Sequence, residues 1–173
     1  MKSIIKTNSH SGFTLIELSL YIIIMGICVL AISNFLNLIN NAKIKNRLIA
    51  EVEQQGEQIS SIIRKNILDS SGINNPLPGS TSTTLSLSFL DTNRNPTIFS
   101  TDVNGNITIK IGTGQVINLN NNFVQTENLS FSNLSRINTR GNINTQFILR
   151  TKGVETRSEY LYAQHFNLTT SRR

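Results

Sequence analysis

The stretch GFTLIELSLYIIIMGICVLAISNFL, residues 12–36, decides the first half of the fold. Its last nineteen residues, 18–36, carry no charged side chain. At a rise of about 1.5 Å per residue, a helix of that length covers the roughly 30 Å of a bilayer's hydrocarbon core. Residues 34–39 do not supply the small side chains of a signal-peptidase site. The stretch therefore predicts a retained membrane-spanning helix over residues 13–40.

Glu17 is the charged residue at the start of this helix, and its position has two interpretations. The segment Thr14-Leu15-Ile16-Glu17 fits the S/T-x-x-E capping box, in which both side chains satisfy free N–H groups at a helix start. Alternatively, Glu17 needs a positively charged partner, because a charged side chain at the bilayer centre costs about 2.5–3.5 kcal/mol. The spacing alone leaves both interpretations open.

The run Gly12-Phe13-Thr14-Leu15-Ile16-Glu17 resembles the prepilin cleavage and methylation motif of type IV pilin-like proteins. The resemblance implies that a prepilin peptidase cuts between Gly12 and Phe13. It further implies that residues 1–12 are removed as a leader peptide and that Phe13 is N-methylated. In this reading Glu17 pairs with the new N-terminal ammonium of a neighbouring subunit, and the pair penalises wrong register because breaking it leaves a buried charge unpaired.

The same resemblance implies a location and partners. The chain would cross the bacterial inner (cytoplasmic) membrane once, with its N-terminus in the cytoplasm. An inner-membrane assembly platform would then place it in an extracytoplasmic filament with other pilin or pseudopilin subunits. Asn34 stands where many major pilins have a helix-breaking proline, and Cys28 is the only cysteine, so the head has no disulfide. Both features favour a minor pilin or type II secretion pseudopilin with a structural, assembly-priming role and no enzymatic activity.

The charges around the span do not by themselves give its orientation. Lys2 and Lys6 precede it, whereas Lys43, Lys45 and Arg47 follow it, so the positive-inside rule does not place the N-terminus in the cytoplasm. The alternative function is a non-polymerising, single-span anchored binding module with a β-rich exported head. A net charge of +6 and a pI of about 9.8 would permit nucleic-acid binding, but the basic residues are scattered.

Residues 41–71 predict an amphipathic continuation of the helix out of the membrane. Gly56 interrupts it and costs roughly 1 kcal/mol relative to alanine, which indicates a local weakness. Gly72 suits the end of the helix, and the turn-rich residues 72–84 predict a linker. Apolar residues at helical spacing form the stripe that needs a cover: Ile44, Leu48, Val52, Ile59, Ile62, Ile63 and Ile67.

Residues 85–173 predict a β-rich head in which an antiparallel meander covers the helix. The fold class is therefore α+β, with a long N-terminal helix packed against an antiparallel sheet. Asn104-Gly105 is the strongest hairpin signal. The predicted strands are residues 85–89, 97–101, 107–111, 115–119, 124–131, 145–151 and 159–167.

The head offers no residues from which to build a catalytic site. The two histidines are His10, in the leader, and His165, which is most simply a strand residue. Asp91 to Asp102 imitates an EF-hand loop, but Pro96 replaces the glycine that the sixth position needs, so a polar turn is preferred. No metal and no cofactor are expected. The N-x-S/T triplets at Asn106, Asn128, Asn133 and Asn167 are read as chance in an Asn-rich chain.

Overall fold

A computed structural model describes residues 14–136, 139–152 and 161–172. The first element is the helix α1 (Leu15–Asp69), and all the strands follow it. The chain divides into two compact units, Met1–Lys43 and Ile44–Arg173, which are described separately below. The predicted order, a long N-terminal helix and then strands, is confirmed, and with it the α+β fold class.

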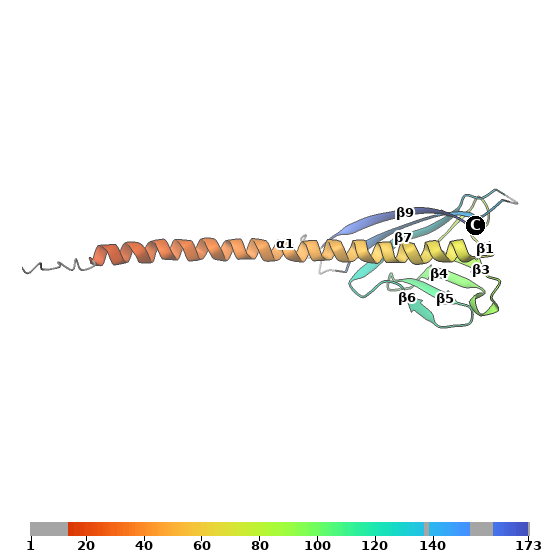
Figure 1. Cartoon of the computed structure of the whole chain (residues 1–173), viewed down its shortest axis with the longest axis horizontal. Helices are drawn as coiled ribbons and strands as arrows, with labels where there is room; N and C mark the ends of the chain where they lie inside the picture. Colours follow the sequence, from red (N-terminus) through yellow and green to blue (C-terminus); the bar gives the residue numbers. More distant parts are fainter. Residues whose placement is uncertain (1–13, 137–138, 153–160, 173) are drawn as a thin grey trace, which may run out of the picture. The chain divides into compact units, whose positions relative to one another are not determined.

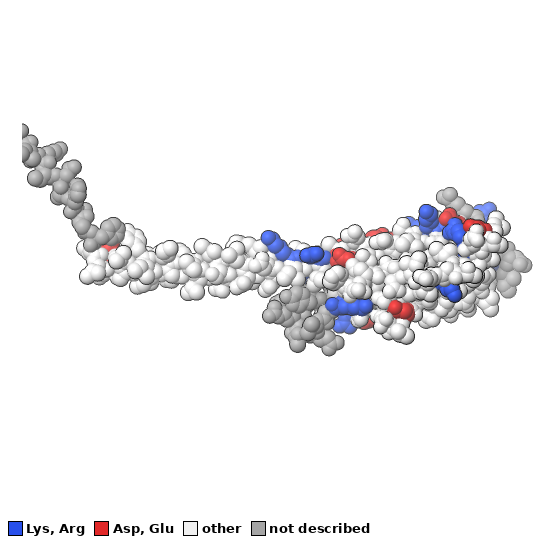
Figure 2. Space-filling view, turned by 90° about the horizontal axis from the view of Figure 1, so that it is seen from below, with Lys and Arg blue, Asp and Glu red and all other residues white. Residues whose placement is uncertain are grey.

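The described part of the first unit is the apolar beginning of α1. Its best 18-residue window has a mean hydropathy of 2.6 and is 0% buried. Large apolar side chains such as Leu15, Ile22 and Leu30 are exposed along it. In the space-filling view of Figure 2 the apolar part of the helix is white up to the first basic side chains. By length and composition the helix can cross a membrane.

The second unit combines the rest of α1 with two antiparallel sheets. A five-stranded sheet has the order β1-β3-β4-β5-β6, and a four-stranded sheet has the order β2-β7-β8-β9. Figure 1 shows β7 and β9 on one side of α1 and β3 to β6 on the other. The first sheet consists of β1 (Gly72–Asn75), β3 (Leu85–Ser88), β4 (Thr97–Thr101), β5 (Ile107–Ile111) and β6 (Val116–Asn118). The second consists of β2 (Thr81–Ser82), β7 (Val124–Asn133), β8 (Asn142–Thr151) and β9 (Ala163–Ser171).

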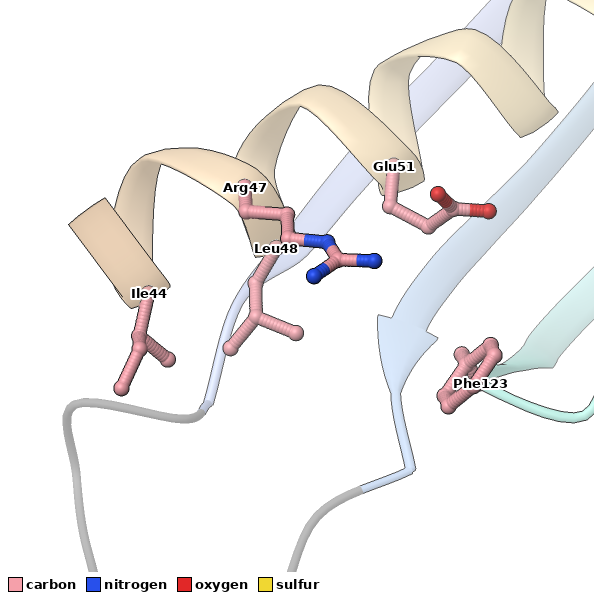
Figure 3. Close-up of a pocket in the computed structure, with 5 residues that line it drawn as sticks. All are labelled: Ile44, Arg47, Leu48, Glu51 and Phe123. Carbon is pink, nitrogen blue, oxygen red and sulfur yellow. The ribbon is translucent and has the colours of Figure 1, made fainter.

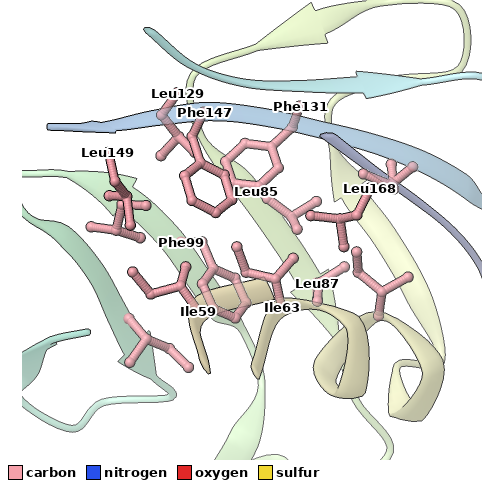
Figure 4. Packing of buried hydrophobic residues seen from close by; sticks show 14 of the residues in the cluster. Ile59, Ile63, Leu85, Leu87, Phe99, Leu129, Phe131, Phe147, Leu149 and Leu168 are labelled. Atoms are coloured by element: carbon pink, nitrogen blue, oxygen red, sulfur yellow. The ribbon is translucent and has the colours of Figure 1, made fainter. Parts of the chain in front are cut away.

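The core lies between the helix and both sheets, as Figure 4 shows. From the predicted helix stripe, Val52, Ile59, Ile63 and Ile67 are fully buried, and Ile62 packs against the cluster. Ile44 is 39% exposed and Leu48 is half-buried, so the stripe is fully buried only from Val52 onward. The strands contribute the alternate residues of each sheet's inner face: Leu85, Leu87, Phe99, Ile107, Ile109, Val124, Leu129, Phe131, Ile143, Phe147, Leu149 and Leu168.

Two expectations for the head are corrected. Residues 72–84 were predicted as a linker, yet they contain β1 and β2, which pair with β3 and β7. Both strands are too short and too polar to show an alternating apolar pattern, so only their pairing defines them. The predicted single meander is instead two sheets, because the chain leaves the first sheet after β6 and the helix stripe is covered from two sides.

The last strand was predicted at residues 159–167, but β9 runs from Ala163 to Ser171. Residues 159 and 160 lie outside the described part of the chain. The end of β9 is polar in sequence, yet Thr170 is buried beside Leu168 on the inner face. A run of Thr and Ser gives no alternating hydrophobic signal, so the sequence pattern stops too early.

The structure gives Gly56 a packing role that the sequence did not predict, besides its cost in helix propensity. Gly56 is buried, and the ring of Phe166 from β9 occupies the place where a Cβ atom would lie. Phe166 also stacks on Phe147, with ring centroids 5.1 Å apart. The missing side chain therefore lets a strand approach the helix closely.

Candidate functional site

The start of α1 holds the one sequence-predicted site residue whose structure is described, Glu17. Leu15 is the first helical residue, which makes Thr14 the N-cap and Glu17 the third residue of the helix. The Glu17 backbone N–H lies 3.4 Å from Thr14 Oγ1 and 3.1 Å from the Thr14 carbonyl oxygen. Thr14 therefore supplies the first half of the capping box.

The second half of the capping box would need the Glu17 carboxylate to accept a hydrogen bond from the Thr14 backbone N–H. Among the described residues, this carboxylate has no hydrogen bond or ion pair, and the Glu17 side chain is exposed. A carboxylate in the first turn also interacts favourably with the helix dipole. Thr14 thus caps the helix without using the Glu17 side chain, whose charge remains open to a partner.

Gly12 and Phe13, the predicted cleavage and methylation positions, lie outside the described residues. Their assignment therefore stays a prediction from the sequence. The structure does show how exposed the residues after Phe13 are. From Thr14 to Leu38 each residue of the helix is exposed, so its apolar surface has no cover within the described chain. Such a surface needs lipid or other apolar helices around it.

In the head, α1 and the segment before β7 form an apolar notch of about 380 Å³. Figure 3 shows Ile44, Leu48 and Phe123 around it, framed by Arg47 and Glu51. The Phe123 side chain is 67% exposed. Glu51 is fixed from the strand side, because its Oε1 accepts a hydrogen bond from Asn121 Nδ2 at 2.6 Å. The notch offers contact surface and one positive group, but no catalytic group.

The sequence pattern did not identify Phe123 as a surface residue, because it immediately precedes a predicted strand. The residues before it in the sequence could have indicated its exposure. Three consecutive asparagines, residues 120–122, come before it, and a lone aromatic residue in such a polar loop is unlike a core position. Asn121 then bonds to Glu51 and positions the loop against α1.

The EF-hand-like segment is not a loop in the structure. Strand β4 runs through its middle, and the two end residues serve separate turns. Asp91 caps the short 3₁₀ helix η1 (Thr92–Arg94) by accepting a hydrogen bond from Asn93 N at 2.9 Å. Asp102 closes the β4–β5 hairpin by accepting from Asn104 N and Asn106 N, at 2.8 and 2.7 Å. The preferred reading of these residues as polar turns is confirmed.

Interactions within the head change the pKa of the Asp102 carboxyl group. Burial raises its pKa, but the hydrogen bonds from Asn106 and Asn104 and the positive charge of Lys152 outweigh this effect, and the pKa is lowered below the usual 3.8. The same interactions hold the hairpin turn in place. They account for Asp102 without any bound ligand.

The other candidate residues stay apart from one another. His165 lies in β9 and is exposed, as its reading as a strand residue predicted. Cys28 is exposed on the apolar helix. In residues 14–136, 139–152 and 161–172 there is no group of three His, Cys, Asp or Glu side chains that could hold a metal ion. On the face seen in Figure 2, blue and red side chains are interspersed over the head rather than gathered into one basic area.

Comparison with sequence models of protein families gives a match at the start of the chain. The sequence model described as the prokaryotic N-terminal methylation motif matches residues 7–33. The match includes the Gly12 to Glu17 run and the first part of the apolar helix, and it leaves the head untouched. No curated protein and no solved structure matches the chain.

The matched motif indicates a structural protein anchored in a membrane by a single apolar helix. The helix is followed by strands that pack on its second half, an architecture like that of pilins. The chain therefore carries a prepilin-type N-terminal methylation motif at residues 7–33, which is consistent with a type IV pilin-like protein, and its α+β architecture is pilin-like.

Proposed function

We propose that the chain is the precursor of a minor pilin or pseudopilin, a subunit of a type IV pilus or of a type II secretion-like filament. Its leader, residues 1–12, is removed by a prepilin peptidase, and Phe13 becomes the N-methylated first residue. The subunit then has a structural role and helps to start filament assembly. This proposal rests on the motif match at residues 7–33 and on the helix that follows it.

The observation that carries the proposal is a single carboxylate in the first turn of α1, whose residues up to Leu38 are exposed and otherwise without charge. Between Glu17 and Lys43 the sequence contains no charged residue. The helix surface there is not covered by the rest of the described chain. Thr14 already caps the helix start through its own side chain, so the cap does not need the charge of Glu17.

A neighbouring subunit would supply the positively charged partner for the Glu17 carboxylate. Cleavage before Phe13 creates an ammonium group that is itself costly in an apolar filament core. When this ammonium group lies beside Glu17 of the next subunit, the two charges compensate each other. Breaking such a buried pair costs about 3–5 kcal/mol, so a subunit docked in the wrong register is strongly disfavoured. The pair then acts mainly on register rather than on net stability.

The partners in this proposal are other pilin or pseudopilin subunits, the prepilin peptidase and an inner-membrane assembly platform. The precursor resides in the bacterial inner membrane with its N-terminus in the cytoplasm and its head outside. The absence of a proline at Asn34 supports the minor class, because nothing in the sequence of the span breaks the helix there. On the face seen in Figure 2, basic side chains are interspersed with acidic ones rather than gathered into one area, which gives nucleic-acid binding little support.

The proposal is tested by mass spectrometry of the N-terminus of the membrane-extracted protein from cells with an active prepilin peptidase. The expected mature chain begins at N-methylated Phe13. A Gly12→Val variant is expected to keep its leader, whereas Gly26→Val, a matched change within the apolar helix, is expected to be processed. A wild-type chain that still begins at Met1 in such cells would overturn the proposal in favour of a simple anchored module.

A further inference from the structure

The four-stranded sheet has a hollow of about 400 Å³ on the face turned away from the core. Side chains from the outer face of β7, β8 and β9 surround it, and the paired residues Phe147 of β8 and Phe166 of β9 also line it. The exposed amides of Asn128, Gln146 and Asn167 lie around it, together with exposed His165 and half-buried Ile148. The hollow lies in the head alone and plays no part in the filament role proposed above.

A β-bulge in β7 brings Asn128 into the hollow. The pairing of β7 with β8 shifts register between Glu127 and Ser130. Asn128 has a φ of +55°, and it is the one non-glycine residue with positive φ in the described chain. Bulges turn side chains in new directions, and left-handed backbone at a non-glycine residue costs of order 1 kcal/mol or more. Asn128 itself is exposed, because the bulge shifts the alternation of β7 so that Leu129 and Phe131 face the core after it.

Hydrogen bonds to Asn144 orient two of the amides beside the hollow, those of Gln146 and Asn167. Asn144 Nδ2 donates to Asn167 Oδ1 at 2.7 Å and to Thr169 Oγ1 at 2.9 Å. Gln146 Nε2 donates to Asn144 Oδ1 at 3.0 Å. Among the described residues, Gln146 Oε1, Asn167 Nδ2 and both polar atoms of the Asn128 amide form no hydrogen bond. The oriented amides of Gln146 and Asn167 each leave one polar atom for a ligand, and the Asn128 amide leaves both.

The face around the hollow has almost no free charge. Within the sequences of β7, β8 and β9, Glu127 and Arg150 are the only Asp, Glu, Lys or Arg residues. Their side chains pair with each other across the strands at 3.4 Å. A polyanion such as nucleic acid needs unpaired cations, and this face offers none in the strands described. An apolar peptide would leave the amides without partners, which is unfavourable.

We propose that this hollow binds a neutral carbohydrate. Sugar hydroxyls both donate and accept hydrogen bonds, which matches the free atoms of Asn128, Gln146 and Asn167. Ile148 gives the C–H face of a pyranose ring an apolar surface. Small-molecule sites commonly combine a concave surface with a few fixed polar groups, and the amide network supplies such groups here. The exported head of this chain thus carries a glycan-binding site of its own.

Direct binding measurements test the proposal on the full chain in a detergent without a sugar headgroup. The probes are neutral oligosaccharides of glucose, mannose, galactose and N-acetylglucosamine, with heparin as the polyanionic comparison. We expect at least one neutral oligosaccharide to bind and heparin not to compete with it. Binding to none of the neutral probes at millimolar concentration, or to heparin alone, would overturn the proposal.

Variants then locate the site. Asn128→Gly removes the amide but keeps the positive φ accessible, and Gln146→Ala removes the second amide. Together they are expected to weaken binding at least tenfold, while Asn118→Ala, at an exposed asparagine of β6, leaves it unchanged. Unchanged binding in the double variant would place the ligand elsewhere and refute the assignment. Hydrogen exchange on the unaltered chain is a second measurement: the glycan should slow exchange in residues 146–148 and 165–167, and equal exchange with and without glycan would also refute it.

Discussion

Phe166 of β9 lies directly over Gly56 of α1, and its ring fills the space that a side chain at position 56 would need. The ring stacks on Phe147 of the adjacent strand, so the four-stranded sheet and the helix meet at a glycine. Glycine weakens an isolated helix, but at position 56 it allows Phe166 to pack closely against the helix and bury it.

Gly56→Ala is therefore expected to destabilise the head, although alanine is the better helix former. The gain in helix propensity is about 1 kcal/mol, whereas forcing a methyl group into a filled site costs about 1–3 kcal/mol. We expect the melting temperature of the full chain in detergent to fall. In a Phe166→Ala background the ring is gone, so the same substitution should raise it. A higher melting temperature for Gly56→Ala in the wild-type background would contradict the packing argument.

Thr145→Val is expected to stabilise the head. Thr145 is fully buried, its hydroxyl has no hydrogen-bond partner, and its cross-strand neighbours are Phe131 and Leu168. Removing an unsatisfied buried hydroxyl at nearly constant volume should gain about 1 kcal/mol. The measurement is the free energy of unfolding by denaturant.

Thr108→Val is the matched control for that change. Thr108 is equally buried, but its hydroxyl donates to the Ser100 carbonyl oxygen at 3.1 Å and lies 3.0 Å from the Ser100 hydroxyl. This variant should lose about 1 kcal/mol. If both valine variants shift stability in the same direction, hydrogen-bond satisfaction does not explain the difference.

Asn120→Ala should destabilise the head by about 1–3 kcal/mol, because it leaves buried polar groups without partners. Asn120 Oδ1 accepts from Ile107 N at 2.7 Å, and its Nδ2 donates to Asn106 Oδ1 and to the Val124 carbonyl oxygen. The amide thus ties β5 to the start of β7. Asn104→Ala, at an exposed turn position, is the control and should stay within about 0.5 kcal/mol of wild type. Equal losses in both variants would show that the buried amide has no special role.

Asp102 makes the stability of the head depend on acidic pH. Its pKa in the folded state is lowered, so its charged form stabilises the fold above the ordinary value of 3.8. That contribution is lost as the pH falls through the lower folded-state pKa, where the native carboxylate also becomes protonated. Asp102→Asn should therefore lower the melting temperature at pH 7, and the difference from wild type should shrink below pH 3.8. A difference that stays constant from pH 7 to pH 2 would exclude this origin.

Glu17→Ala tests the proposed charge pair. We expect leader removal to proceed, since the scissile bond is untouched, while incorporation into filaments falls at least tenfold. The physical reason is the unpaired N-terminal ammonium that the variant leaves in the neighbouring subunit. The readout is the ratio of sheared filament protein to membrane-bound protein. Glu53→Ala, an exposed carboxylate on the same helix, should behave as wild type. If Glu17→Ala subunits assemble normally, the pairing role is wrong.

Strands with alternating apolar residues could be predicted from the sequence alone. Residues 97–101 and 107–111 are strands in the structure at the predicted positions, and Asn104-Gly105 lies in the turn between them. The β1 and β2 strands could not be predicted in this way. Their residues are mostly polar and do not alternate with apolar ones. These two segments are strands only because β3 and β7 supply hydrogen-bond partners.

The hollow on the four-stranded sheet is a second feature that the sequence pattern does not reveal. Asn128, Gln146 and Asn167 are far apart in the chain and lie together only after the strands have paired. An N-x-S/T triplet marks two of them, yet the triplet has no bearing on which face of a strand the amide occupies. The face depends on the register of strand pairing, and the bulge at Asn128 shifts the register of β7 with β8.

The sequence by itself determined the apolar helix, the motif at its start and the class of the fold. These features depend on contiguous residues, whose composition and period set local structure without long-range contacts. Only the tertiary structure decided that two sheets enclose the second half of the helix and that Gly56 is a contact point for Phe166. Each of these depends on which surfaces meet, and burial of apolar area rather than local sequence selects that arrangement.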